Sequence, residues 1–257
     1  FEDLLHSNLQ PVDLFRLLHH PGLKFRGPEQ IALEFRREKP IDYLLITREE
    51  VGGLWNNVPT NLLTLSPGQW MEFAFHSLYQ YKEENGLDIE VNDLIIKKNL
   101  VGYYHSIPER FEQTDNIHCH ECVTCIEPHE AGFLITSRIV GTEATRQYTC
   151  KYVVYAAGQR CNLRRLNVPG EDLLFVTNQY EHPDDFPGDQ VVVVGGGRSA
   201  DWAATELHDA GRHVTYVMRQ PQELHSRLIG NSQFLPYYAR IGEIIQSESP
   251  RFNTLYE

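Results

Sequence analysis

Residues 190–219 read QVVVVGGGRSADWAATELHDAGRHVTYVMR, and this stretch decides the fold. The four valines Val191 to Val194 predict a strand buried on both faces, and Gly195 to Gly197 predict a tight turn after it. A helical pattern follows and is closed by Gly211, and the β-branched run Val214 to Val217 predicts a second strand. Strand, glycine turn, helix and strand in this order form half of a nucleotide-binding unit.

The turn has the spacing Gly195-x-Gly197-x-x-Ala200, with Gly196 at the first variable position, which is the alanine-ended form of the dinucleotide fingerprint. We expect Gly195 to allow the turn, Gly197 to let a pyrophosphate approach the backbone, and Ala200 to pack the helix against the strand. The helix N-terminus then offers unpaired N–H groups and a positive dipole end to the phosphates. A glycine turn in an ordinary α/β crossover that binds nothing is the alternative, and the register of the strand, the helix face and the second strand argues against it.

The end of the second strand indicates which dinucleotide is bound. An NAD-preferring site has Asp or Glu there, which accepts a hydrogen bond from the ribose 2′-OH. Here the strand ends in Met218-Arg219-Gln220, and no carboxylate appears before Glu223. Arg219 suits the 2′-phosphate of NADPH through paired, charge-assisted hydrogen bonds, and Arg198 on the turn offers a second contact. The sequence therefore favours NADPH, with a solvated surface arginine as the alternative reading of Arg219.

The composition is that of a soluble globular protein. The chain has 257 residues, of which 41% are hydrophobic and 23% charged, and a formal net charge of −12, which argues against a nucleic-acid-binding surface. No apolar run approaches the roughly 20 residues of a membrane span. The first ten residues lack the basic start and apolar stretch of a signal peptide, and the odd number of cysteines, 5, suits a reducing compartment. We therefore expect a cytoplasmic protein.

Outside the nucleotide unit the sequence predicts short helices, a loop-rich aromatic region and a β-rich segment. From Asn116 to Tyr155 the apolar period shortens to two, with turns at Glu130–Gly132 and Gly141, so we expect several short strands. The run Tyr152 to Gly158 predicts a buried strand that ends on small residues. The other expected elements are helices at 11–20, 28–38 and 92–112 and a strand at Asp42–Thr47. We place one domain at residues 1–165 and a second at 166–257.

The segment HCHECVTC, residues 118–125, raises the question of a zinc site. Zinc sites usually supply two separated pairs of ligands, with a turn inside each pair. Here the cysteines fall in a strand-like run, and a period of two puts Cys119 and Cys125 on one face and Cys122 on the other. We therefore interpret them as ordinary strand residues and expect no metal. The Cys119-x-x-Cys122 pair is also not at a helix N-terminus, where a thiolate would be stabilised.

Five motifs together carry a resemblance to a known family: VGGLW (51–55), LLTLSPGQWMEF (62–73), YVVYAAG (152–158), NVPGEDL (167–173) and VVVVGGGRSADWAATEL (191–207). With them the chain resembles the two-dinucleotide-domain flavoproteins, and above all the oxidative stress-induced growth inhibitor family, a divergent branch of the flavin-containing monooxygenases. The fold that this resemblance implies is α/β, with FAD/NAD(P)-binding three-layer Rossmann-like domains and an inserted antiparallel β-meander.

The resemblance also implies the cofactors, FAD on the first domain and NADPH on the second. FAD would lie along the turn of Gly52, Gly53 and Trp55, and Ala157 and Gly158 would mark the strand that leaves its domain. Further residues on the flavin or adenine-ribose side would be Ser66, Gln69 and Trp70. Gly195, Gly197, Ser199 and Arg219 would hold NADPH. Each tryptophan can equally be a plain core residue.

Three departures from the family pattern bear on this reading. Residues 1–40 contain only Gly22 and Gly27, so the fingerprint for the FAD pyrophosphate is missing, and we expect both domains to be incomplete. The strand ending at Thr47 lacks the carboxylate for the FAD ribose, and Glu49 and Glu50 are approximate stand-ins. Flavin monooxygenases carry an asparagine where Leu65 or Ser66 stands here, which puts oxygenation in doubt and leaves NADPH binding untouched.

Two classes of function follow from the resemblance. The first is an NADPH-dependent flavoprotein oxidoreductase of the monooxygenase type, with hydride transfer from NADPH to FAD and then reaction with O₂ and a small-molecule substrate. No side-chain catalytic set is visible in the sequence, as expected where the cofactor supplies the chemistry. The second is a regulatory or interaction protein that keeps the flavoprotein fold, binds a protein partner and has lost turnover. A reductase that passes electrons to a protein or quinone is a third option.

Overall fold

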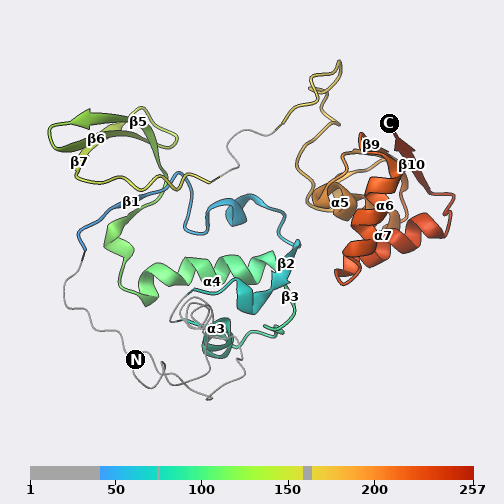
Figure 1. The fold of residues 1–257 in the computed structure, drawn as a ribbon, viewed down its shortest axis with the longest axis horizontal. Coiled ribbons are helices and arrows are strands. Elements are labelled where there is room, and N and C mark those ends of the chain that lie inside the picture. The colour runs from blue at the N-terminus through green and yellow to red at the C-terminus, as the bar shows by residue number, and fades with distance from the viewer. Residues whose placement is uncertain (1–40, 74–75, 159–163) are drawn as a thin grey trace. The chain divides into compact units, whose positions relative to one another are not determined.

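The computed structural model describes residues 41–73, 76–158 and 164–257, and it divides the chain into two compact units, Phe1–Leu166 and Asn167–Glu257 (Figure 1). This division lies one residue from the boundary expected between 165 and 166. We call the two parts unit 1 and unit 2 and describe each by itself. The helices expected at 11–20 and 28–38 lie outside the described residues.

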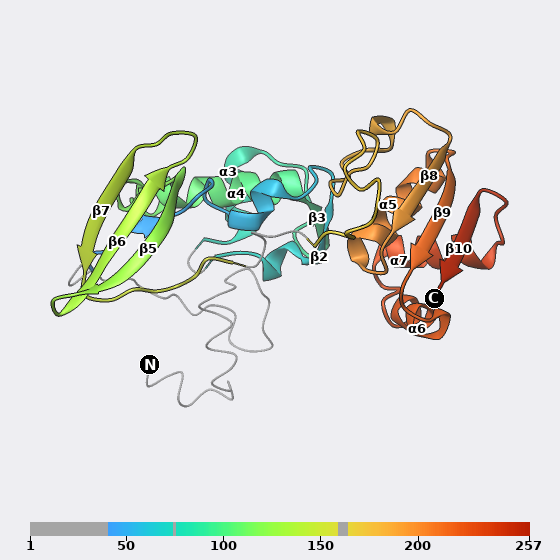
Figure 2. The ribbon, with the colours of Figure 1, turned by 90° about the horizontal axis from the view of Figure 1, so that it is seen from above.

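Unit 2 contains the strand, turn, helix and strand that its sequence predicts. Strand β8 (Gln190–Val194) leads through the glycines into α5 (Arg198–Asp209), and β9 (His213–Met218) follows. Helices α6 (Gln222–Asn231) and α7 (Pro236–Gln246) then lead to β10 (Phe252–Tyr256). The strands pair in parallel in the order β10-β9-β8. Right-handed crossovers that advance in one direction put α5, α6 and α7 on the same side of this sheet (Figure 2).

This one-sided arrangement corrects the expectation that Val191 to Val194 are buried on both faces. Along β9 the side chains that face the helices, Val214, Tyr216 and Met218, are at most 2% exposed. Val192 and Val194 are 62% and 52% exposed instead. No described element covers their side of the sheet, because both crossovers place their helices on the other side. A run of valines indicates a strand, but which faces are covered depends on the topology.

Unit 1 is built around α4 (Lys97–Arg110), which begins five residues after the start of the helix expected at 92–112 and ends two residues before its end. Residues Leu94–Ile96 form the short strand β3, which pairs with β2 (Leu63–Pro67). Helix α3 (Leu78–Asn85) and the short helices η1 (Gly53–Asn57), η2 (Gly68–Trp70) and η3 (Thr114–Asn116) complete this part. The strand expected at 42–47 is reduced to β1 (Leu45–Ile46), which pairs in parallel with β4 (Ile117–His118).

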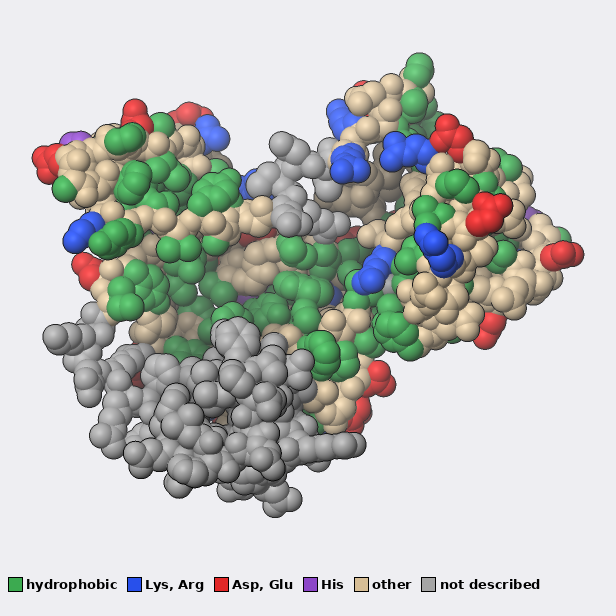
Figure 3. All heavy atoms as spheres, in the orientation of Figure 1, with side chains coloured by type: hydrophobic (Ala, Val, Ile, Leu, Met, Phe, Trp, Pro, Cys, Tyr) green, Lys and Arg blue, Asp and Glu red, His purple; other side chains and the backbone are tan. Residues whose placement is uncertain are grey.

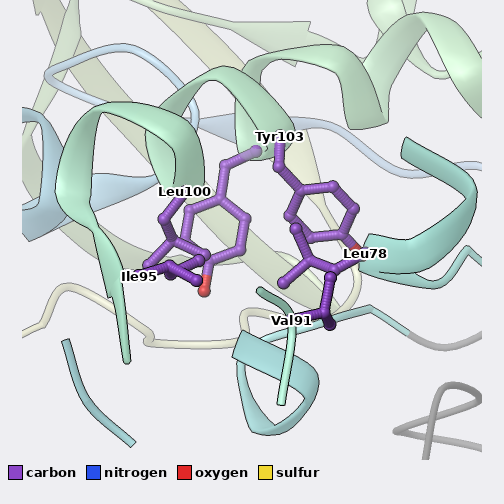
Figure 4. Packing of buried hydrophobic residues seen from close by; sticks show 6 residues of the cluster. Leu78, Val91, Ile95, Leu100 and Tyr103 are labelled. Atoms are coloured by element: carbon purple, nitrogen blue, oxygen red, sulfur yellow. The ribbon is translucent and has the colours of Figure 1, made fainter. Parts of the chain in front are cut away.

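The core of unit 1 forms between α3, α4 and the segment that joins them. Leu78, Leu100 and Tyr103 are fully buried, and Val91 and Ile95 pack beside them (Figure 4). The Tyr103 hydroxyl accepts from the Phe73 N–H at 2.6 Å and donates to the His76 carbonyl at 2.6 Å. Burial raises the pKa of Tyr104, a neighbour in the same helix, to about 12. Both tyrosines therefore stay neutral and tie α4 to the η2 region.

The antiparallel meander expected in the first domain is confirmed. Strands β5 (Glu121–His129), β6 (Gly132–Ile139) and β7 (Thr145–Cys150) pair in the order β5-β6-β7, with turns where Gly132 and Gly141 predict them. Cys119 lies outside the strands, and the register shifts between Val123 and Cys125, so simple alternation does not hold across the cysteines. The described residues hold no group of three or more His, Cys, Asp or Glu able to bind a metal ion.

The prediction of a buried strand from Tyr152 to Gly158 is wrong. The segment has no strand structure, and Tyr152, Val154 and Tyr155 are 78%, 89% and 82% exposed. A strand needs hydrogen-bonded neighbours, and none of the described residues pairs with this segment. Exposed hydrophobic side chains are visible on the surface of both units (Figure 3). Within the described parts of the chain, no helix has the length and apolar composition that crossing a bilayer requires.

Candidate nucleotide-binding site

In the glycine turn of unit 2, other protein atoms lie close to Gly195 but not to Gly197. Gly195 has φ +155°, and a Cβ on it would lie 2.9 Å from the Cβ of Ala200, so helix and strand meet closely here. The Gly195 N–H donates to the Val217 carbonyl at 2.9 Å, which ties the turn to the end of β9. A Cβ on Gly197 would meet nothing within 4 Å. The space beside Gly197 is therefore accessible to a ligand.

The N-terminus of α5 offers free backbone donors at this open position. Gly197 is the N-cap in an extended conformation, and no side chain caps the helix. Its carbonyl accepts from the N–H groups of Ala200 and Asp201 at 2.9 and 3.0 Å. Among the described residues, no hydrogen bond uses the N–H of Arg198 or Ser199, and both side chains are exposed. An anion is the natural partner of such a helix end.

Arg219 follows directly on β9, two residues after Val217, whose carbonyl accepts from the Gly195 N–H of the turn. Its side chain is exposed, and no described residue forms an ion pair with it. The next residue, Gln220, folds back over the turn, since a Cβ on Gly196 would lie 2.8 Å from the Gln220 Cδ. The Gln220 Nε2 is buried and has no hydrogen-bond partner among the described residues. The structure thus brings Gln220, the neighbour of Arg219, to the turn, and Gln220 is a residue of this candidate site that the sequence did not reveal.

A second group of side chains that the sequence reading missed lies beneath the turn. Asp201, in the first turn of α5, is fully buried and accepts from the Tyr216 hydroxyl at 2.7 Å. It also accepts from the His225 Nε2 at 2.9 Å. Burial and the Asp201 carboxylate raise the pKa of Tyr216, so this hydroxyl stays protonated and is the donor. The signal in the sequence was a carboxylate on the apolar face of a helix.

The glycine pair of unit 1 forms a turn whose carbonyls are bound by the side chain of Asn56. Gly52 and Gly53 have φ +108° and +54° and begin η1. The Asn56 Nδ2 lies 2.9, 3.2 and 3.1 Å from the carbonyls of Glu50, Val51 and Gly53. His105 of α4 donates from Nε2 to the Asn56 Oδ1 at 2.8 Å. The turn is thereby anchored on α4.

The residues expected along FAD are brought together in part. Tyr104 of α4 lies against Gly52, and its hydroxyl donates to the carbonyl of Met71 next to η2 at 3.0 Å, so η1 and η2 pack on one helix. Trp55 packs against the core and is half-buried, whereas Trp70 is 58% exposed and is no core residue. Ser66 on β2 and Gln69 on η2 are half-buried. Ala157 and Gly158 lie exposed in the irregular segment after the meander.

A cavity of about 530 Å³ lies beside the Gly52 turn. Its wall is formed by Glu50, Val51, His105, Pro108, Glu109, Thr114, Ile117 and Cys119. Glu50, one of the two stand-ins for the ribose carboxylate, lines it and pairs with the His120 Nε2 at 2.8 Å. Burial and the nearby Glu50 carboxylate raise the pKa of the Cys119 thiol, so this cysteine is a poor nucleophile.

Several known proteins are similar to this chain over part or all of its length. The human protein "Oxidative stress-induced growth inhibitor 1" is 24% identical over the full chain, which confirms the resemblance, and the chain covers 59% of its length. A ferredoxin–NADP reductase of Ignicoccus hospitalis is 39% identical over 84 residues, 33% of this chain and 28% of that protein. The structure titled bacillithiol disulfide reductase Bdr (YpdA) of Bacillus cereus shares the fold with a TM-score of 0.66 at 20% identity, over 83% of this chain and 59% of that one.

The chain therefore spans a little over half the length of the growth inhibitor relative that it matches from end to end. The family model for "Pyridine nucleotide-disulphide oxidoreductase" matches residues 30–240. FAD and NADP(H) are the cofactors that this match implies. The chain belongs to the pyridine nucleotide-disulphide oxidoreductase family.

Proposed function

We propose that this chain carries the dinucleotide-binding part of an NADPH-dependent flavin oxidoreductase. One observation carries the proposal: an open, uncapped helix N-terminus at Gly197 lies beside an arginine without an ion-pair partner among the described residues, Arg219. The helix end suits a pyrophosphate, and the guanidinium suits a further phosphate on the ribose. These two features support binding of NADPH at this helix end.

The residues of unit 2 have separate tasks in this proposal. The N–H groups of Arg198 and Ser199 donate to the pyrophosphate, while Gly197 leaves room for it. Arg219 forms a bidentate pair with the 2′-phosphate, and the exposed Arg198 side chain adds positive charge. The Gln220 amide, buried over Gly196, offers a further donor at the same edge.

In unit 1, the Gly52 turn and the cavity beside it are the features that would hold FAD. Glu50 lines the cavity and is placed to accept from a ribose hydroxyl, and Gly52 and Gly53 leave the backbone bare. Ser66, Gln69 and Trp70 would border the same cofactor from η2 and β2. When bound, the flavin accepts a hydride from the nicotinamide and passes electrons on.

The electron acceptor is the finer part of the proposal. The resemblance to flavin monooxygenases favours O₂, with a small-molecule substrate oxygenated. The named reductases among the relatives favour a reductase as the second candidate, and Leu65 and Ser66 at the position of the family's asparagine agree with it. A regulator that binds NADPH without turnover is the remaining alternative. NADPH oxidation with added FAD, measured with and without O₂, separates the three.

The test of NADPH recognition is Arg219→Asp, with Arg227→Asp as the matched control. Arg227 is an exposed arginine on α6. We expect Arg219→Asp to weaken NADPH binding about 10- to 100-fold, because a charge-assisted pair is replaced by repulsion, and to change NADH binding less than about threefold. The control should change neither. Equal losses for NADPH and NADH in Arg219→Asp would show that Arg219 does not contact the 2′-phosphate.

Retention of FAD is a separate expectation. The 257 residues contain one dinucleotide fingerprint, in unit 2, and none in unit 1. We therefore expect this chain to bind FAD weakly and to lose it on desalting, because the pyrophosphate of FAD lacks a glycine turn and helix end of its own. A purified 257-residue protein that keeps stoichiometric flavin absorbance after desalting would contradict this.

A further inference from the structure

A buried carboxylate in unit 2 connects three elements at the nucleotide site. Asp201 is fully buried in the first turn of α5. Its Oδ1 accepts from Tyr216 of β9 at 2.7 Å and from His225 of α6 at 2.9 Å. Its Oδ2 is buried and has no hydrogen-bond partner among the described residues. This group of Asp201, Tyr216 and His225 is called the Asp201 triad below.

The Asp201 triad holds the segment that carries Arg219 from both sides. Tyr216 lies three residues before Arg219, and His225 lies six residues after it. Between them the chain leaves β9 at Met218 and enters α6 at Gln222. Both ends of this short connection are therefore bonded to the same carboxylate.

That carboxylate belongs to the helix whose N-terminus would receive the pyrophosphate. Asp201 is four residues after Gly197, and its N–H donates to the Gly197 carbonyl at 3.0 Å. The Gly195 N–H to Val217 carbonyl bond joins the two strand ends at the turn, and the Asp201 side chain adds a second link, from α5 to both flanks of the segment that carries Arg219. A shift of α6 or β9 against α5 would move the guanidinium away from the 2′-phosphate.

Stability alone does not explain a carboxylate at this position. Removal of a carboxylate from water costs several kcal/mol, and here one oxygen receives no compensating hydrogen bond. A well-packed apolar side chain is often as stable or more stable in such a place, whereas a bonded polar group fixes one arrangement of its neighbours. The tyrosine hydroxyl and the imidazole are also fully buried, so all three groups give up water to make these bonds.

We propose that Asp201 is a positioning residue for NADPH selectivity: by bonding Tyr216 and His225 it sets Arg219 at the distance from the α5 N-terminus that a 2′-phosphate requires. The inference rests on the proposed function, because it needs Arg219 to bind the 2′-phosphate. Asp201 is buried and does not contact the nucleotide, and in this proposal it nevertheless controls whether NADPH or NADH is preferred.

The quantity that tests this is the selectivity ratio, defined as the Kd for NADH divided by the Kd for NADPH, measured by fluorescence titration of the full 257-residue chain. We expect Asp201→Ala to lower the ratio about tenfold, because two hydrogen bonds to a charged group are lost and Arg219 is released. Asp201→Asn keeps an acceptor oxygen and should retain the ratio within about threefold. In an Arg219→Ala background, Asp201→Ala should have no further effect on the ratio.

A purely structural role would give a different result. Ile244→Ala, which opens a cavity in α7 of the same unit, serves as the matched control because Ile244 is 1% exposed and takes no part in the triad. It should lower the thermal midpoint and leave the ratio unchanged. If Asp201→Ala does not fold, Tyr216→Phe removes a single hydroxyl and should lower the ratio about threefold without loss of the fold.

The outcomes are distinct. The inference is overturned if Asp201→Ala, or Tyr216→Phe in its place, weakens NADH and NADPH by the same factor while Arg219→Ala collapses the ratio. If the unaltered chain binds both nucleotides equally, the proposed NADPH recognition fails and the inference fails with it. A lowered ratio that disappears in the Arg219→Ala background supports both.

Discussion

The two glycine turns of this chain look alike in sequence and differ in the helix that follows them and in how their carbonyls are bound. In unit 1 the Asn56 amide lies within hydrogen-bond distance of three carbonyls of the Gly52 turn, and His105 holds the amide in turn. Neither helix start has a side-chain cap, and a Cβ on Gly53 or on Gly197 would meet nothing within 4 Å, but Gly197 directly precedes the 12-residue helix α5 whereas Gly53 begins the 5-residue helix η1. A glycine pair by itself indicates only a tight turn. The N-terminus of a full α-helix adds aligned N–H groups and a positive dipole end, which favour an anion.

The largest expected effect comes from closing the open turn. Gly197→Val places a side chain where a Cβ meets nothing within 4 Å, so the fold should lose less than about 1 kcal/mol. The pyrophosphate would then be excluded from the helix end, and we expect NADPH and NADH to bind about 100-fold more weakly, to the same extent. Calorimetric titration measures this, and unchanged affinity would remove the distinction between the two turns.

The second effect is a loss of stability, which we expect to be larger for substitution of Gly195 than for substitution of Gly53 in unit 1. Gly195→Ala imposes φ +155° on a residue with a Cβ and brings that atom 2.9 Å from the Ala200 Cβ, so we expect a loss of about 2–4 kcal/mol. Gly53→Ala, at φ +54° with nothing within 4 Å, should cost about 1 kcal/mol. Urea unfolding gives both values. Equal losses would show that the helix–strand contact at Ala200 does not require glycine.

The sequence revealed those parts of the molecule whose signals are local. The β8–α5–β9 unit and the meander have strong periodicity and turn residues at fixed offsets, and both are present in the structure. The interpretation of Tyr152 to Gly158 is wrong because a strand depends on a neighbour that local propensity cannot supply. That helices cover only one side of β8 could not be predicted from its valines, because it follows from the handedness of two successive crossovers.

In the candidate site, too, the sequence predicts the residues that follow a local pattern and not those that only packing brings together. Arg219 stands 22 residues after Gly197, directly after the second strand, where the fingerprint has the residue that faces the ribose, so a spacing rule points to both. The Asp201 triad joins residues 15 and 24 positions apart, and only packing brings them together. Gln220 was overlooked because its significance lies in a buried, unpartnered amide over Gly196, which no spacing rule encodes.

A smaller effect on stability tests the role of Asn56 in the Gly52 turn. Asn56→Ala removes the amide that binds the carbonyls of the Gly52 turn, and we expect unit 1 to lose about 1–2 kcal/mol. Dinucleotide binding by the Gly197 turn should stay unchanged, because its donors belong to unit 2. Denaturant unfolding and NADPH titration on the same variant check both statements. A parallel loss of NADPH affinity would mean that the two turns do not act separately.

The smallest expected effect is on stability and concerns Gly196, which lies between Gly195 and Gly197. A Cβ on Gly196 would lie 2.8 Å from the Gln220 Cδ, which is the far end of a flexible side chain. Gly196→Ala should therefore cost less than about 1 kcal/mol, and the double variant with Gln220→Ala should recover that loss. Thermal unfolding of the three variants gives the coupling. Additive losses would show that Gln220 does not lie over the turn in solution.

The most direct test of the whole account is amide NMR of the 257-residue chain titrated with adenosine 2′,5′-bisphosphate, the part of NADPH that carries the extra phosphate. The predicted result is that the largest shift changes fall on the N–H groups of Gly197, Arg198 and Ser199 and on the Arg219 guanidinium, with 5′-AMP leaving Arg219 unmoved. Shift changes confined to other residues, or none at saturating ligand, would contradict the assignment of this helix end and this arginine to the phosphates.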